Sequence, residues 1–189
     1  MKSISQFLAP LAFIVALALG LPAGAQSANT AGQSVFASAV VSDGTGVVTT
    51  VAATGTYVTV GTAAPLAAGE ADGSGCITYT LATNRFTIAR RCGVGIVQLS
   101  ACLNDATGLL SKTWTGAWHR IRAATPTIQG PIVRRTEAGT ALRESHGCVT
   151  VFVDAQLNDT FDFRYDSSAN ADTVTTRQAF FSAVKIFSK

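Results

Sequence analysis

The sequence predicts an all-β protein, an antiparallel jelly-roll β-sandwich of about eight to ten strands. Short runs rich in Val, Thr, Ile and Phe alternate with Gly and Asn turns, which is typical of strands. No apolar period of 3.6 residues persists after residue 25, so no amphipathic helix is expected. The 189 residues have room for one domain, and only 13% are charged against about 25% in an average soluble domain, which argues against a coiled coil or a nucleic-acid-binding arm.

Residues 1–25 have the organisation of a cleaved secretory signal peptide. Lys2 supplies a positive charge, residues 8–21 are mostly apolar, and Ala-Gly-Ala at 23–25 matches a cleavage site. The apolar stretch is shorter than the roughly 20 residues that span a bilayer, so we expect no membrane span. The mature protein is expected to begin at Gln26 and to be secreted, either extracellular or periplasmic.

The mature chain divides by composition into two parts. Residues 26–75 are rich in Gly, Ala and Thr and predict N-terminal strands, and residues 76–189 predict the core of the jelly-roll domain. The run at 93–103 is mostly apolar, and we expect it to be buried on both faces. Strands are predicted at residues 77–81, 85–88, 93–103, 118–123, 148–153, 160–166 and 179–187.

The order of these motifs resembles the trimeric jelly roll of the tumour-necrosis-factor and complement-q globular-head superfamily over about residues 76–187. The segments that carry the resemblance are YTLATNRFTI at 79–88, GVGIVQLSA at 93–101, the turn QLND at 156–159, the strand 161–165 and AFFSAVKI at 179–186. The resemblance implies a homotrimer that acts by binding, without catalysis. It also implies that late-strand aromatic residues pack around the three-fold axis, and we therefore expect Phe163, Tyr165 and Phe181 at the subunit interface.

All four cysteines follow the leader, so export predicts two disulfides. Three connectivities are possible; if residues 93–102 form one strand, Cys92 and Cys102 lie about 30 Å apart, too far to be joined. In the resembled jelly roll, that strand lies antiparallel to the strand that begins at Cys148. The resemblance therefore implies Cys102 with Cys148 and, by remainder, Cys76 with Cys92.

A second resemblance supplies an alternative function. Ser145-His146-Gly147-Cys148-Val149 is similar to the signature of L,D-transpeptidases, cell-wall enzymes whose cysteine thiolate is activated by histidine. Cys148 would be the nucleophile, with His146 or His119 as its base. Thr150 replaces the Arg of that motif, and three further cysteines favour an oxidised Cys148, so we predict that the protein is not an enzyme.

Charge is distributed unevenly along the chain. Residues 85–143 contain nine basic and two acidic side chains, a net charge of +7, and residues 144–176 contain six acidic and one basic, a net of −5. This pattern predicts a cationic surface for an anionic cell-surface polymer or polysaccharide, complementary faces that steer subunit assembly, or scattered charges that never meet. The candidate anion-binding residues are Arg120, Arg122, Arg134 and Arg135.

The remaining candidate residues predict no further site. His119 and His146 lack zinc-site spacing, and no calcium-loop motif occurs, so no metal or cofactor is expected. Trp114 and Trp118 are expected to cover the edge of the sandwich rather than to stack on a sugar. The leading prediction is a secreted binding and assembly protein; the alternatives are the transpeptidase-like enzyme and a structural surface or matrix domain.

Overall fold

Runs of β-branched and aromatic residues form strands throughout the residues that the computed structural model describes, which are 35–41, 46–61, 66–107, 112–136 and 145–188. A 3-10 turn, η3 (Arg90–Cys92), interrupts them. The strands are β1 (Val35–Val41), β2 (Val47–Val51), β3 (Val58–Thr59), β4 (Ala67–Ala71), β5 (Ile77–Thr80), β6 (Arg85–Ile88), β7 (Gly95–Thr107), β8 (Thr113–Arg122), β9 (Thr125–Thr136), β10 (Ser145–Ala155), β11 (Thr160–Ser167) and β12 (Asp172–Ser188).

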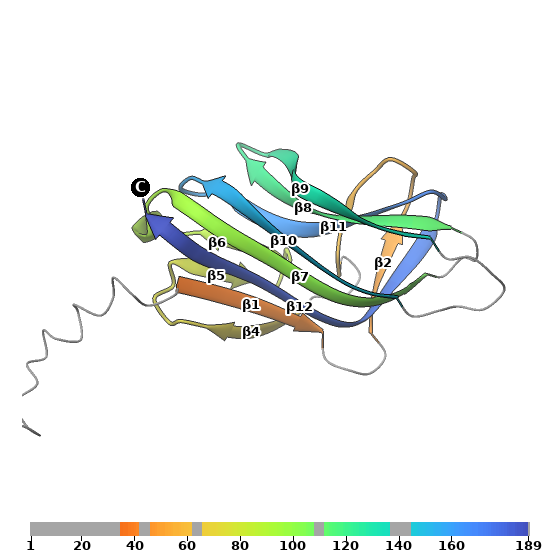
Figure 1. Cartoon of the computed structure of the whole chain (residues 1–189), viewed down its shortest axis with the longest axis horizontal. Helices are drawn as coiled ribbons and strands as arrows, with labels where there is room; N and C mark the ends of the chain where they lie inside the picture. Colours follow the sequence, from red (N-terminus) through yellow and green to blue (C-terminus); the bar gives the residue numbers. More distant parts are fainter. Residues whose placement is uncertain (1–34, 42–45, 62–65, 108–111, 137–144, 189) are drawn as a thin grey trace, which may run out of the picture. The chain divides into compact units, whose positions relative to one another are not determined.

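These strands form two antiparallel sheets that pack face to face (Figure 1). Sheet A has the order β10-β7-β12-β1-β4, with β2 also paired to β12, and sheet B has the order β5-β6-β11-β8-β9, with β3 also paired to β11. Most neighbours are distant in sequence, which is the topology of a jelly roll rather than a meander. The predicted all-β jelly-roll sandwich is therefore confirmed, with short strands β2 to β4 raising the number to twelve in the described residues.

Residues 35–71 belong to the same sandwich as the rest of the described chain. β1 pairs with β12 over its whole length, from Val35↔Lys185 to Val41↔Ala179, and β3 pairs with β11 in the other sheet. The predicted leader, residues 1–25, lies outside the described residues. Within the described ranges, no helix is long and apolar enough to cross a membrane.

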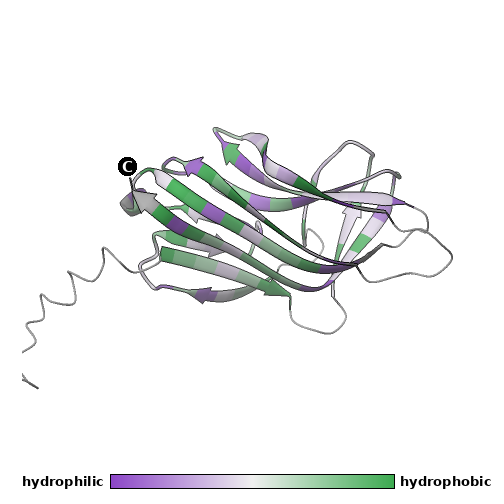
Figure 2. Cartoon of the chain, in the orientation of Figure 1, coloured by the Kyte–Doolittle hydropathy of each residue, from purple (hydrophilic) through white to green (hydrophobic). Residues whose placement is uncertain are grey.

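The core contains the aromatic side chains Trp114 and Trp118 of β8, three aromatic side chains of β11, and Phe181 of β12. Along β11, Phe161, Phe163 and Tyr165 alternate with polar residues and are at most 3% exposed, as the period-two pattern predicts. Trp118 lies 5.5 Å from Phe163 and 6.2 Å from Phe181 between ring centroids. Figure 2 shows hydrophobic residues recurring along the strands of both sheets.

This core corrects the predicted subunit interface. Phe163, Tyr165 and Phe181 are 3%, 0% and 1% exposed within a single chain, so they have no surface left to bury against a second copy. Tyr165 donates a hydrogen bond of 2.8 Å from Oη to Asp105, and burial together with that carboxylate raises the pKa of Tyr165. The alternation along β11 identified a buried face correctly, but its partner is sheet A of the same chain.

The two tryptophans also lie elsewhere than predicted. Trp114 and Trp118 are 1% and 0% exposed, and they point between the sheets rather than covering an edge. Residues two apart in a strand share a face, so Gly116 points inward between them. A Cβ at Gly116 would lie 2.7 Å from a ring carbon of Phe163, so glycine is what makes room for that ring.

Candidate functional site

The outer face of sheet A is the surface that this sheet turns away from sheet B. Inward-pointing residues such as Leu99 and Phe181 are buried in the core, so their even-numbered neighbours in β7, β10, β12 and β1 point outward. Strand register places them in three rows across the sheet. We define the outer face of sheet A by these rows: Phe152, Gln98, Val184 and Phe36; Thr150, Ser100, Ser182 and Ser38; Cys148, Cys102, Phe180 and Val40.

These three rows are uncharged and partly apolar, and the next exposed residues along β10, His146 at one end and Asp154 at the other, bound them. None of the twelve residues is ionisable apart from the bonded cysteines, and Phe152 and Phe180 are 66% and 49% exposed. In the middle row, the hydroxyls of Ser100 and Thr150 lie 3.0 Å apart and bond each other. A solvent-facing side of an antiparallel sheet ordinarily carries polar and charged residues, whereas an uncharged surface with exposed aromatics is typical of interfaces.

The face also corrects the expectation that the run at 93–103 is buried on both sides. In β7, Val97, Leu99 and Ala101 are at most 1% exposed, whereas Cys102 is exposed and Ser100 is half-buried. One side of β7 therefore lies in the core and the other remains open in the single chain.

A groove of about 500 Å³ opens at the Phe180 end of this face. It is lined by Cys102 and Cys148, by Phe180 and Val41, and by the side chain of His146, which precedes Cys148 by two residues in β10. The groove is hence mostly apolar, with a disulfide in its wall.

The disulfides join the pairs that the resemblance implies. Cys102 and Cys148 are directly opposite each other in β7 and β10, with their Cα atoms 4.0 Å apart. Cys76 and Cys92 flank the β5–β6 hairpin, with their Cα atoms 4.8 Å apart. The described residues contain no free cysteine.

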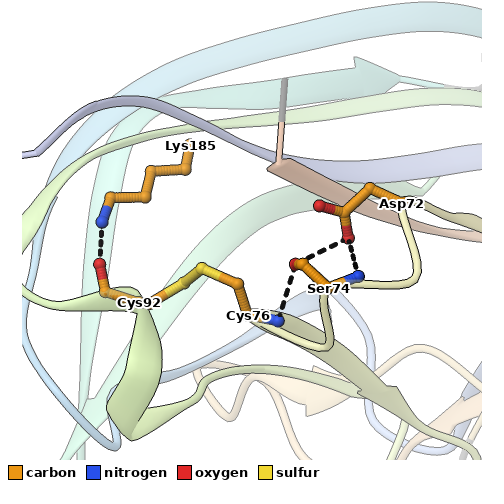
Figure 3. Close-up of a disulfide and its surroundings, with 5 residues drawn as sticks. All are labelled: Asp72, Ser74, Cys76, Cys92 and Lys185. Carbon is orange, nitrogen blue, oxygen red and sulfur yellow. Dashed lines mark hydrogen bonds between the residues drawn. A yellow bond between two sulfur atoms is a disulfide. The ribbon is translucent and has the colours of Figure 1, made fainter. Parts of the chain in front are cut away.

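Polar contacts surround the Cys76–Cys92 bridge (Figure 3). Ser74 accepts a hydrogen bond of 3.0 Å from the Cys76 N–H, and Asp72 accepts a bond of 3.0 Å from the Ser74 hydroxyl. Lys185 of β12 donates to the carbonyl of Cys92, and burial lowers the pKa of Lys185. The bridge and Lys185 thus connect the β5–β6 end of sheet B to sheet A.

The residues of the alternative enzyme do not form a catalytic group. The Cys148 sulfur is bonded to Cys102, so no thiol is present to act as a nucleophile. His146 lies near it in the groove of sheet A, but His119 lies in β8 of sheet B. In the described ranges, no group of three or more His, Cys, Asp or Glu is arranged to hold a metal ion.

Of the candidate arginines, Arg120 and Arg122 lie together at the Asp154 carbonyl, and Arg134 lies apart from them along the strands. Arg122 makes two hydrogen bonds to Asp159, of 2.8 and 2.6 Å, and this contact raises the pKa of Arg122. Arg120 donates to the backbone carbonyl of Asp154 at 3.3 Å. Arg134 is exposed in β9, where the strand register places it opposite Thr115 of β8. Thr115 lies about 16 Å along β8 from Arg120. The neighbouring residue Arg135 is opposite Trp114 in the same ladder.

Instead, the basic and acidic segments of the chain meet each other within sheet B. Arg85 contributes Nε to Asp162 at 3.1 Å, and Arg122 bridges to Asp159. Asp162 also accepts bonds from Arg164 and from the Thr59 hydroxyl, which attaches β3 to β11. Two basic side chains of segment 85–143, Arg85 and Arg122, therefore have acidic partners from segment 144–176 inside one chain.

His119 occupies a buried position on the outward side of β8. It is 4% exposed, its ring lies 4.8 Å from that of Tyr57, and Nδ1 is 3.3 Å from the Ala117 carbonyl. Burial lowers the pKa of His119 from 6.5, and the charges facing it are those of Arg164 and Asp162. The folded protein therefore favours the neutral imidazole.

This burial predicts a pH-dependent stability. As the pH falls from about 7.5 to about 5, the unfolded chain protonates His119 near its ordinary pKa while the folded chain resists, so the free energy of unfolding decreases. Urea unfolding across this range should show a slope that is reduced in His119→Gln and retained in the matched variant His146→Gln, since His146 is exposed. An unchanged slope in His119→Gln would contradict this assignment.

The exposed aromatics Phe152 and Phe180 were not among the residues predicted for the site. The signal was present: in Val151-Phe152-Val153 and in Phe180-Phe181, apolar residues occupy consecutive positions and so both sides of a strand. One residue of each run enters the core and its neighbour points outward. Consecutive apolar residues in a half-buried strand thus indicated a second contact surface.

Together, the two sheets and their strand order define the fold as a TNF-like jelly roll. Among the solved structures that share it are Eiger TNF from S. frugiperda, with a TM-score of 0.56, 12% identity and coverage of 82% of this chain and 95% of that one, and murine APRIL, with a TM-score of 0.50, 10% identity and coverage of 82% and 100%. No protein-family profile matches the sequence, and no curated protein matches it. At these identities, the likeness concerns the fold.

Proposed function

We propose that the chain is a secreted, non-enzymatic binding domain that self-associates as a homotrimer through the outer face of sheet A. The observation that carries the proposal is the uncharged face itself, with Phe152 and Phe180 exposed on it. Burial of such a surface removes apolar area from water without stranding a charge. The two disulfides and the signal-like leader support secretion.

A closed trimer requires that two different surfaces meet, because a head-to-tail ring cannot be built from one self-complementary patch. The chain offers a second apolar surface on the edge strand β9, where Ile128 and Ile132 are each 44% exposed. If β9 of one copy packs against the outer face of sheet A of the next copy, both apolar surfaces are buried. The TNF-like resemblance supports three as the number of copies.

Substitution of the exposed aromatics tests this proposal. Phe152→Asp and Phe180→Asp should each weaken association at least about a hundredfold, since a carboxylate would be buried in an apolar contact. Light scattering and sedimentation should show a trimer for the unmodified protein at micromolar concentration and a monomer for both variants.

Leu81→Asp is the matched control, because Leu81 is 48% exposed but follows β5 in sheet B. It should remain trimeric. A monomeric unmodified protein, or equal weakening by all three substitutions, would refute assembly through this face.

A further inference from the structure

The two disulfides differ sharply in their exposure. Cys76 and Cys92 are each 6% exposed and belong to the core. Cys102 and Cys148 are both exposed on the outer face of sheet A. The rate at which a thiol attacks a disulfide depends on access to its sulfur atoms, so one bridge is shielded and the other is open.

The open bridge is also not needed to hold its two strands together. The ladder between β7 and β10 continues on both sides of it, from Ser145↔Asp105 to Ala155↔Gly95. β7 is further paired with β12 on its other edge. Cleavage of the bridge therefore leaves Cys102 and Cys148 side by side in an intact sheet, where they can close again.

The groove provides room for an attacking thiol. Its volume of about 500 Å³ is bounded by both half-cystines and by Phe180, and it exceeds the space that a small dithiol occupies. Its apolar lining suits a peptide segment or an organic thiol. No such open approach is available to the core-embedded Cys76–Cys92 bridge, whose half-cystines are almost fully covered.

These features point to a further site: we infer that the Cys102–Cys148 disulfide is a thiol-exchange site of the unassembled chain, with a dithiol as its reactant. A thiolate of the dithiol attacks one Sγ, the S–S bond breaks, and the other Sγ leaves as a thiolate and takes up a proton. The second thiol of the reagent, after losing its proton, attacks the mixed disulfide and releases the first cysteine, which is then protonated. The protein gains two electrons and two protons, and the reactant becomes a cyclic disulfide.

A regulatory consequence follows, and it rests on the proposed function. If the outer face of sheet A is buried between copies, the groove closes and the bridge becomes inaccessible. Assembly would then protect the oxidised form, and only free chains would exchange with thiols.

Timed reduction of the unmodified protein tests the site. A dilute sample is treated with dithiothreitol, quenched with iodoacetamide at intervals and mapped by mass spectrometry, while circular dichroism follows the fold. Cys102 and Cys148 should be alkylated at least about tenfold faster than Cys76 and Cys92, with the β signal unchanged. Equal rates, faster reaction of Cys76–Cys92, or reaction only on unfolding would overturn the inference.

Two further arms separate this inference from the proposed function. The double variant Cys102→Ser/Cys148→Ser keeps the Cys76–Cys92 bridge and should take up label only at the slow rate of that bridge; labelling of it at the original fast rate would overturn the assignment. In a concentrated sample that light scattering shows to be trimeric, reduction of Cys102–Cys148 should slow; an unchanged rate in the trimer overturns protection by assembly. Fast reduction in a protein that remains monomeric at every concentration upholds the exchange site and refutes trimerisation.

Discussion

Replacing Trp118 with alanine is expected to lower the free energy of unfolding by about 3 to 5 kcal/mol. Trp118 is 0% exposed and lies at ring-contact distance from Phe86, Phe163 and Phe181. These rings come from both sheets, so the cavity would open in the centre of the sandwich, where neither sheet can collapse without disturbing the other. Urea unfolding followed by circular dichroism measures the change.

Trp118→Phe is the matched variant. The Trp118 indole N–H is buried and has no hydrogen-bond acceptor in the described part of the chain. Phenylalanine removes that unsatisfied donor while retaining an aromatic ring, so it should cost less than half as much as alanine. Equal losses for the two substitutions would show that the ring contacts of Trp118 contribute little to stability.

Replacing Asp162 with asparagine is expected to cost about 3 kcal/mol. The carboxylate is 0% exposed and accepts hydrogen bonds from Arg164 at 2.7 and 3.0 Å, from Arg85 at 3.1 Å and from Thr59 at 2.9 Å. Asparagine has the same shape, but its NH2 group is a donor and would face the N–H donors of the guanidinium groups. The substitution also removes the negative charge opposite Arg164, whose side chain is only 13% exposed. The expected value is at the low end for a buried pair because the Arg85 side chain is 35% exposed.

The same change should loosen β3, because Thr59 is bonded to Asp162 and paired with Arg164. Hydrogen exchange of residues 56–61 should accelerate more than that of β12. Asp154→Asn, on an exposed carboxylate of β10, is the control and should change stability by less than about 1 kcal/mol. A similar loss in both variants would argue against a special role for the Asp162 cluster.

The extent to which the sequence predicted the strands depends on local pattern. The strand predicted at 85–88 coincides with β6, and that at 160–166 lies within β11, because turns at Asn84 and Asn158, both with positive φ, bound clear alternation. β9 was missed. It contains Pro126 and Pro131, which argue against a central strand, but β9 is at the edge of sheet B, where a residue without an N–H is tolerated.

The candidate site, too, was predictable from the sequence only in part. The resemblance implied the disulfide pairs that the structure shows, whereas the residues expected at the subunit interface, Phe163, Tyr165 and Phe181, are buried within one chain. Phe180 and Phe181 are adjacent in β12, and a strand sends neighbouring side chains to opposite faces. Which of the two faces meets sheet B depends on how the sheets stack, and no local pattern reports that.

By itself, the sequence determined the all-β class, the alternating faces of the strands and the positions of many turns, since these follow from short-range periodicity and turn chemistry. The tertiary structure alone decided where the aromatic and charged residues end up. It buried Phe163 and Tyr165 within one chain, joined Arg122 to Asp159, and left Phe152 exposed on the uncharged face. The physical reason is that contacts across the sandwich join residues far apart in the chain, so their partners are fixed only when two sheets close over a shared core.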